Sequence, residues 1–393
     1  MSRGLGDVYK RQVSLSANLY GEIGTLPAGE VGFALGAEDR TEKGWRDPDS
    51  TVLQNGGESA IRGSSDVTEV YGEVSIPLLS DAALAKNLDL TVAGRWSDYS
   101  SFGSNTTYKL GAVWQLNDQV TVRTVASTAF RVPTISEQEG STNQENLITV
   151  DPCEGATGAT ATNCLADGVP ANFVQDGTTV LTGVGGNPDV KPEEADTFTF
   201  GIVLEPEFAE GLTATIDYFD IKIDNAINAV DGSDQLRLCY LDPAVYADFC
   251  NSFTRDPITN QVTFLSKRPV NAAKEEVSGL DLAFTYNTEI AGLDTLFSLR
   301  ATHLLTHENQ ANPAAEVEVL KGKITADRGS FAEWRANASA KVFADQWSAS
   351  WSMRMIGEAE DENGGGPIGS SVDNIFYHDL HFTYDVTESA KLS

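Results

Sequence analysis

The feature that most constrains this chain is an alternation of apolar and polar residues that recurs in segments of about ten residues or more. One face of residues 88–96 carries Leu88, Leu90, Val92 and Trp96, and the other carries Asp89, Thr91 and Arg95. A repeat of two residues is typical of a β-strand whose two faces meet different surroundings. No long window shows the 3.6-residue repeat of an amphipathic helix, so we expect an all-β fold.

Thirteen segments of the chain show this alternation, and we predict that each is a strand. They cover residues 13–22, 30–41, 67–78, 88–98, 105–116, 119–130, 194–205, 211–222, 276–287, 292–306, 331–344, 347–357 and 373–386. Strands of ordinary globular proteins average about five or six residues. Tilted strands that cross a bilayer need about nine to eleven residues, so the predicted lengths favour a membrane barrel.

The segments between the predicted strands alternate between short and long. The long ones are 42–66, 131–193, 223–275, 307–330 and 358–372, and only 99–104 is short where a long segment is expected. Outer-membrane barrels have short periplasmic turns and longer extracellular loops. A soluble β-sandwich has no reason to place nearly all its long loops at one end.

Charge and hydropathy exclude several classes of protein. Lys and Arg number 27 against 57 Asp and Glu, which gives a formal net charge of −30. A surface this acidic repels phosphate backbones, so nucleic acid is excluded as a partner. No apolar run approaches the ~18 residues of a spanning helix. Transmembrane strands alternate and are not excluded by this test.

The four cysteines form two pairs with equal spacing, Cys153 with Cys164 and Cys239 with Cys250. Four cysteines allow three connectivities, and two local loops closed between neighbours is the simplest. No CxxC motif or nearby histidine cluster indicates a zinc site. Two disulfides imply an oxidising compartment, and both pairs lie in long loops on the predicted outer side.

The two ends look unlike those of a complete exported protein. Residues 1–12 are basic and polar, without the apolar region and cleavage site of a secretory signal. We interpret residues 1–12 as a non-native leader and residues 13–393 as a barrel domain. The chain stops after a turn-like stretch, where another strand would begin. We therefore expect an interior piece of a longer protein.

Several stretches resemble the β-barrel of TonB-dependent outer-membrane receptors. They are EVYGEVSIPLL at 69–79, the Arg-x-Ser-x-Tyr-Ser-x-Phe-Gly and Phe-Arg-x-Pro-Thr-Ile patterns within 90–137, NPDVKPEEADTFTFGIVLEP at 187–206, DYFDIKIDNAI at 217–227 and VSGLDLAFTY at 277–286. The resemblance covers about residues 13–386. Their order and spacing make the combined resemblance strong, although each motif alone is only moderately specific.

The resemblance implies a 22-stranded outer-membrane barrel of a Gram-negative bacterium, of which this chain would supply about 13 strands. It also implies an N-terminal plug and import of a scarce solute, driven by the TonB–ExbB–ExbD complex through a TonB box. The solute would be a siderophore, cobalamin or an oligosaccharide. The sequence departs from the pattern in having no TonB box, no plug and no final strand ending in an aromatic residue. Outer-membrane lipid and lipopolysaccharide are the further expected partners.

Two other functions remain open from the residues alone. The chain could be a passive porin, or a secreted soluble β-rich protein that binds or cleaves carbohydrate. Close carboxylates such as Glu137 and Glu139 are consistent with a glycosidase pair, but solvated loop charge explains them better in so acidic a chain. No GxSxG, HExxH or P-loop motif is present, and Asp361–Gly366 lacks the ligand pattern of an EF-hand. We predict no enzymatic activity and no cofactor or metal.

Substrate contact is expected in the loops 131–193 and 223–275, because both are long and external and each is expected to contain a disulfide. A staple restricts the loop ensemble and lowers the entropic cost of capturing a ligand. The candidate contact residues are Arg131, Tyr240, Phe249, Phe253 and Arg255. Packing between loops is the competing explanation for each of them.

Overall fold

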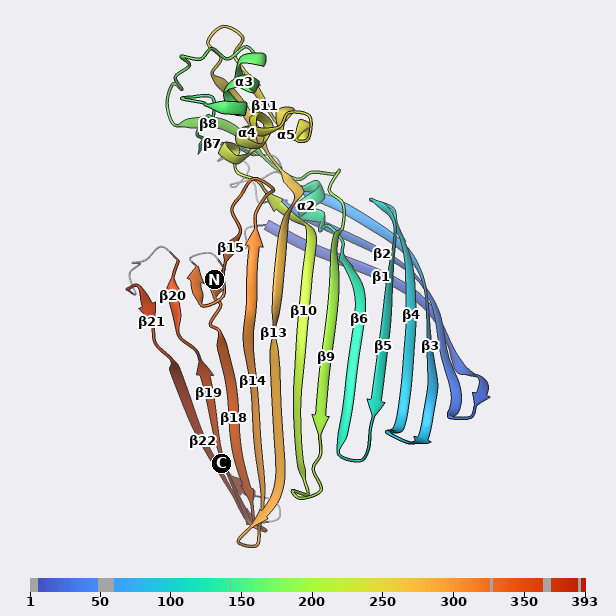
Figure 1. The fold of residues 1–393 in the computed structure, drawn as a ribbon. Coiled ribbons are helices and arrows are strands. Elements are labelled where there is room, and N and C mark those ends of the chain that lie inside the picture. Colours follow the sequence, from blue (N-terminus) through green and yellow to red (C-terminus); the bar gives the residue numbers. More distant parts are fainter. Residues whose placement is uncertain (1–5, 49–59, 142, 326–327, 363–368, 388–389) are drawn as a thin grey trace.

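The computed structural model describes residues 6–48, 60–141, 143–325, 328–362, 369–387 and 390–393. One large curved sheet dominates the molecule, and a smaller lobe stands above one end of its strands (Figure 1). Among the described residues, no helix has the length and apolar character needed to cross a membrane.

The large sheet is antiparallel, and consecutive strands are neighbours along nearly all of it. Its order is β1 (Gly6–Leu26), β2 (Gly29–Pro48), β3 (Ile61–Ala82), β4 (Ala85–Tyr99), β5 (Gly103–Gln115), β6 (Val120–Arg131), β9 (Glu193–Leu204), β10 (Leu212–Ala229), β13 (Pro269–Ile290), β14 (Leu293–Gln310), β18 (Trp334–Phe343), β19 (Trp347–Ile356), β22 (Ile375–Thr387) and β23 (Ala390–Leu392). All thirteen predicted strands are present, and β23 adds a short one. The sheet is therefore an open, partial barrel.

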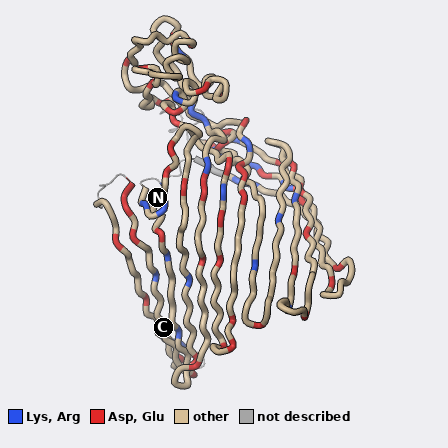
Figure 2. The backbone as a smooth tube through the Cα atoms, viewed as in Figure 1, with Lys and Arg blue, Asp and Glu red and all other residues tan. Residues whose placement is uncertain are grey.

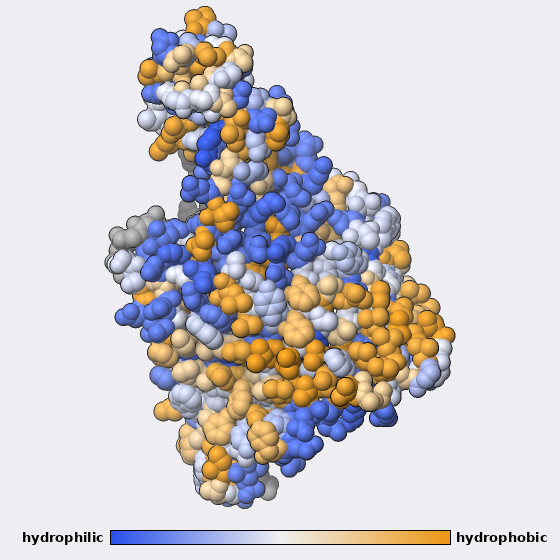
Figure 3. All heavy atoms as spheres, in the orientation of Figure 1, coloured by the Kyte–Doolittle hydropathy of each residue, from blue (hydrophilic) through white to orange (hydrophobic). Residues whose placement is uncertain are grey.

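The apolar rows predicted from the sequence lie on the outer face of this sheet. Many large apolar residues there are exposed, among them Tyr108, Leu110, Phe198, Ile216, Leu380 and Phe382. Figure 3 shows a hydrophobic band across the strands, with a mostly hydrophilic surface above it. Acidic residues are frequent at the upper strand ends and lower turns, as Figure 2 shows. This pattern fits strands with lipid on one side and a polar lumen on the other.

Short and long connections lie at opposite ends of the strands, as predicted (Figure 1). Tight turns join β1 to β2, β3 to β4 and β13 to β14, and each leaves only two residues outside the strands. The segment 100–102 is the one short connection at the opposite end. Several strands run further than predicted: β10 reaches Ala229 and β13 begins at Pro269. The predicted loops 42–66 and 223–275 are correspondingly shorter.

Two long loops fold together into one lobe, which we call the loop module (residues 143–184 and 230–267). Its sheet has the order β11–β12–β8–β7, with β8 and β12 parallel. Its elements are β7 (Asn143–Ile148), α3 (Gly158–Ala166), β8 (Thr179–Val184), α4 (Gly232–Leu241), α5 (Ala247–Cys250), β11 (Phe253–Arg255) and β12 (Val262–Lys267). Both disulfides expected from the sequence are in it, Cys153–Cys164 and Cys239–Cys250.

The two following long loops form a second, smaller sheet with the order β17–β16–β20–β21. Its strands are β16 (Lys323–Thr325), β17 (Gly329–Ser330), β20 (Ala359–Asp361) and β21 (Ser371–Val372), and β15 (Glu318–Val319) pairs with β14 nearby. Within the described residues, the long loops between β6 and β22 therefore make ordered contacts at the same end of the barrel.

Candidate functional site

A cleft separates the loop module from the upper rim of the barrel. Its volume is about 1170 Å³, and among its lining residues are Phe102, Lys191, Tyr246, Phe249, Arg268 and Asn271. We call it the rim cleft. Much of its lining comes from α5, from the β4–β5 connection, from the linker 185–192 that leads to β9, and from Arg268 with the start of β13. A concave site where several loops meet is where a ligand can be enclosed.

The linker 185–192 and the start of β13 form a hydrogen-bonded neck under the module. Asn187 Nδ2 donates to the carbonyl of Pro269 at 2.9 Å. Lys191 N–H donates to Asn271 Oδ1 at 2.8 Å, and Asn271 Nδ2 donates back to the Lys191 carbonyl at 2.7 Å. These contacts explain the Asn-Pro-Asp-Val-Lys-Pro run at 187–192, because the Asn187 amide and the two prolines fix the path of this linker against the start of β13.

Two cations line the rim cleft without partners. The side chains of Lys191 and Arg268 are exposed, and within the described part of the chain neither makes an ion pair or a hydrogen bond. The carboxylates of Asp189, Glu194 and Asp248 also line the cleft but do not pair with these cations. Aromatic rings, amides and unpaired cations together can hold a planar, anionic ligand.

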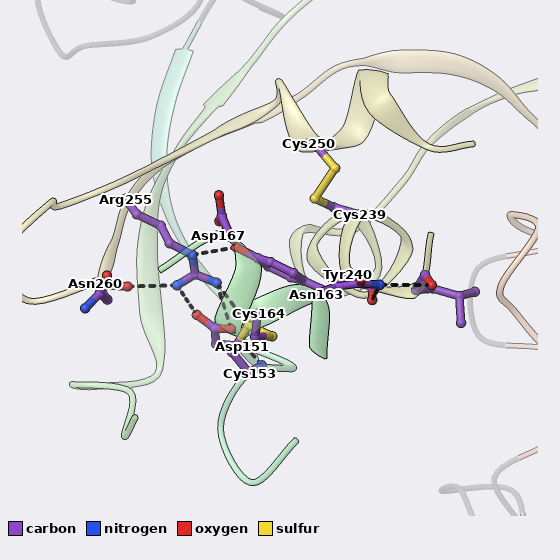
Figure 4. Close-up of a disulfide and its surroundings, with 11 residues drawn as sticks. Asp151, Cys153, Asn163, Cys164, Asp167, Cys239, Tyr240, Cys250, Arg255 and Asn260 are labelled. Carbon is purple, nitrogen blue, oxygen red and sulfur yellow. Dashed lines mark hydrogen bonds and ion pairs between the residues drawn. A yellow bond between two sulfur atoms is a disulfide. The ribbon is translucent and has the colours of Figure 1, made fainter. Parts of the chain in front are cut away.

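The loop module is held together by a buried charge network (Figure 4). Arg255 donates to both carboxylate oxygens of Asp151, at 2.6 and 3.0 Å, and their side chains are 9% and 1% exposed. Arg255 Nε donates to the Tyr240 hydroxyl at 2.8 Å, which in turn donates to Asp167 at 2.6 Å. Burial, with the hydrogen bond to Asp167, raises the pKa of Tyr240. Burial disfavours the Arg255 cation, but its contact with Asp151 more than compensates and raises the pKa of Arg255.

Three of the five predicted contact residues, Tyr240, Phe253 and Arg255, therefore pack together in the interior of the module. Tyr240 is 1% exposed, and its ring centroid lies 6.1 Å from that of Phe253. The Arg255 guanidinium lies over both rings. In the structure these residues support one another, which matches the competing explanation of loop packing. Phe249 is separate from them and lines the rim cleft. Substrate contact stays a prediction for all five.

Arg131, the fifth predicted residue, is the last residue of β6. It contacts α2 and the start of β9 at the barrel rim. It donates to both oxygens of Glu193, each at 2.6 Å, and to those of Glu137 at 3.0 and 3.1 Å. Glu137 belongs to α2 (Ile135–Glu139) and closes a capping box with Thr134. Burial opposes ionisation of Glu137, but hydrogen bonds from Arg131 and Thr134 prevail and lower its pKa.

Sequence reasoning missed the contacts that depend on distant loops. Asp151 and Arg255 are 104 residues apart, and nothing in their local patterns indicates the pair. The sequence shows that Lys191 and Arg268 are positively charged, but only the fold shows that they line the same cleft. Among the described residues, no group of three or more His, Cys, Asp or Glu side chains could hold a metal ion.

Comparisons with known proteins give one consistent result. The family model "TonB dependent receptor-like, beta-barrel" matches residues 3–393. No curated protein sequence matches. The solved siderophore receptor PirA of Acinetobacter baumannii aligns with a TM-score of 0.61 at 16% identity, over 97% of this chain and 49% of PirA. A mutant ferric enterobactin receptor PfeA of Pseudomonas aeruginosa, in complex with enterobactin, gives 0.66 at 15% identity, over 97% and 47%.

The hemophore receptor HasR of Serratia marcescens, a double mutant in complex with the hemophore HasA and heme, gives a TM-score of 0.59 at 14% identity. That alignment covers 97% of this chain and 55% of HasR. The chain thus spans about half the length of these solved structures. The chain belongs to the TonB-dependent receptor family, whose β-barrels lie in the outer membrane, and it forms part of such a barrel.

Proposed function

We propose that this barrel is part of a receptor that captures a scarce anionic solute, of the ferric-siderophore type, at the cell surface and imports it with TonB-coupled energy. Its family consists of transport receptors rather than enzymes. The observation that carries the proposal is the rim cleft, where Lys191 and Arg268 have no ionic partner among the described residues. In a chain with a net charge of −30, two unpaired cations beside aromatic rings favour an anionic ligand over a neutral one.

The solved relatives support this choice without fixing the ligand. PirA is named as a siderophore receptor, PfeA as a ferric enterobactin receptor and HasR as a hemophore receptor. Because their identity to this chain is low, the similarity supports a shared fold and does not identify the ligand. Cobalamin and neutral oligosaccharides remain the other solutes to test, because neither requires the two cations.

The direct experiment measures surface binding and uptake by cells that produce the complete gene product. Radiolabelled ferric siderophores, cobalamin and oligosaccharides are offered in turn, with and without a protonophore. We expect one ferric siderophore to bind, and its uptake to stop when the protonophore or a tonB deletion removes the energy. Uptake that continues without energy would instead identify a passive porin.

A paired variant tests the cleft itself. Lys191→Gln with Arg268→Gln should weaken surface binding of that siderophore by at least tenfold, because each loses a charge-assisted hydrogen bond. Lys222→Gln with Lys274→Gln removes the same charge from the outer face of β10 and β13 and serves as the control. Equal binding by both variants would refute the assignment of the cleft.

A further inference from the structure

The loop module ends, on the side away from the barrel, in a surface built from three segments (Figure 1). We call it the distal tip (residues 148–149, 174–178 and 256–261). β7 ends there and β8 and β12 begin there, while β8 and β12 lead at their other ends to the neck. Gln175 Nε2 donates to the carbonyl of Thr149 at 2.7 Å, and Gln261 Nε2 donates to the carbonyl of Val174 at 2.8 Å. The three segments therefore adjoin.

Each segment of the distal tip exposes a large apolar side chain. Ile148, Val174 and Ile258 are between 62% and 87% exposed. Figure 3 shows hydrophobic side chains at the upper end of the lobe, well above the band that crosses the strands. Single apolar residues scattered over a surface need no partner, but several on adjoining segments mark an interaction surface. Because the tip lies far above the band that contacts lipid, we infer that another molecule covers these side chains.

The turn that carries Ile258 is held in place from below. Asp256 Oδ1 accepts hydrogen bonds from the N–H groups of Ile258 at 2.9 Å and Thr259 at 2.8 Å. Arg255 Nη1, which belongs to the buried charge network, donates to the Asn260 carbonyl at 2.8 Å. A side chain presented by an ordered turn loses little conformational freedom when it binds. The exposed Ile258 is therefore already arranged for a partner.

Carboxylates surround the distal tip, and cations do not. Asp176 and Asp256 belong to it, and the exposed Glu154 accepts a hydrogen bond from it at 3.2 Å. The module has no Lys or Arg within 143–184 and three within 230–267. Of these three, Arg255 is buried, and the other two pair with carboxylates at the start of α4, on the side of the neck and the barrel rim. The exposed charge of the distal tip is therefore negative.

We propose that the distal tip docks a cationic protein, which places an apolar pocket over Val174 and Ile258 and Lys or Arg side chains opposite the surrounding carboxylates. Charge complementarity selects this occupant, because opposite charges across an interface favour association and like charges oppose it. A second copy of this chain, with its net charge of −30, would bring carboxylates against carboxylates. Lipopolysaccharide would bring phosphates against them. The tip is separate from the rim cleft, so this inference does not depend on the proposed function.

Selection from a phage-displayed library of random peptides of about 12 residues, on the purified complete gene product in detergent, tests the surface. We expect the enriched peptides to carry an aliphatic or aromatic residue flanked by Lys or Arg. The most enriched peptide is then labelled with fluorescein and titrated by anisotropy. Val174→Ser with Ile258→Ser should weaken its binding at least tenfold, because two apolar contacts are lost. Val317→Ser with Val319→Ser changes two exposed valines outside the module and should alter binding less than twofold.

A second variant tests the charges without touching an apolar side chain. Glu154→Gln with Asp176→Asn should weaken binding of the same peptide about threefold at low salt and reduce its salt dependence. Wild-type rates of hydrogen exchange in residues 143–184 show that the module of each variant is folded.

Four results would overturn the docking site. They are the absence of any enriched peptide, enriched peptides with no excess of Lys and Arg, binding that survives Val174→Ser with Ile258→Ser, and unchanged salt dependence in the carboxylate variant. Association of the receptor with itself or with lipopolysaccharide micelles that is lost in Val174→Ser with Ile258→Ser would also overturn it, because the occupant would then be anionic. Failure of siderophore binding at the cell surface refutes only the proposed function.

Discussion

The buried pair of Asp151 and Arg255 should determine the stability of the loop module. Asp151→Asn removes the charge but keeps the size of the side chain, and the amide oxygen can still accept one hydrogen bond. The Arg255 guanidinium, whose side chain is 9% exposed, would then lack its counter-charge. Breaking one side of a buried ion pair costs about 3–5 kcal/mol, and the retained hydrogen bond places this variant near the lower figure.

A loss of about 3 kcal/mol corresponds to an opening equilibrium about 100-fold larger. Hydrogen exchange followed by mass spectrometry on the detergent-solubilised complete gene product measures it directly. Peptides from 143–184 and 230–267 should both exchange about 100-fold faster, because the two loops share one core. Peptides from β4, β5 and β6 should keep their wild-type protection.

The control is Asp47→Asn, which breaks an exposed ion pair with Arg62. Exposed pairs contribute about 0–1 kcal/mol, so its effect on exchange should be small. Two outcomes would refute the reasoning: wild-type protection of the module in Asp151→Asn, or faster exchange in only one of the two loops. The second outcome would mean that the loops open separately.

Three further predictions follow from the same structure. Replacing Cys153 and Cys164 by Ser should destabilise the module by about 2–3 kcal/mol, because the unfolded loop regains its closure entropy, and exchange of residues 143–184 measures the loss. Gly201→Ala should lower the free energy of unfolding by about 1–3 kcal/mol, because an added Cβ would lie 1.9 Å from Asp217 Oδ1, which accepts a hydrogen bond from Arg123 across this glycine. The barrel should then unfold at a lower temperature in a heat-modifiable gel-shift assay. Gly94→Ala is the control, because the nearest atom to its added Cβ would be 3.8 Å away. The lowered pKa of Glu137 means that its contribution to stability is complete above its ordinary pKa of 4.5 and is lost as the pH falls through the lowered value. Exchange of residues 132–140 should therefore rise in acid, and Glu137→Gln should remove that pH dependence.

The barrel could be predicted from the sequence because its determinants are local. Alternation in a strand such as 105–116 shows both its extent and its lipid face, and the observed β5, Gly103–Gln115, differs by two residues or fewer at each end. The ends of β10 and β13 were predicted less well, because above the lipid band both faces meet polar surroundings and the alternation fades. The loop module was missed for another reason. Its strands and helices are short, and its core joins residues such as Cys164 and Leu236 from different loops.

The candidate site shows the same division. The long stapled loops were correctly identified, and so was the equal-spaced pairing of cysteines. Tyr240 and Arg255 stood out as chemically rich residues, but the sequence does not tell whether such side chains face a ligand or one another. Residues 1–12 remain predicted to be a non-native leader, and β1 includes residues 6–12.

The neck at Asn187, Lys191 and Asn271 has a consequence for engineering this receptor. Because the linker 185–192 and the start of β13 exchange hydrogen bonds, and because the two loops share a core, neither loop can fold without the other. Grafting one of them onto a homologous barrel would carry half of a hydrophobic core and an uncompensated buried charge. The smallest transplantable unit is residues 185–192 and 268–272 together with both loops they support, moved in a single step.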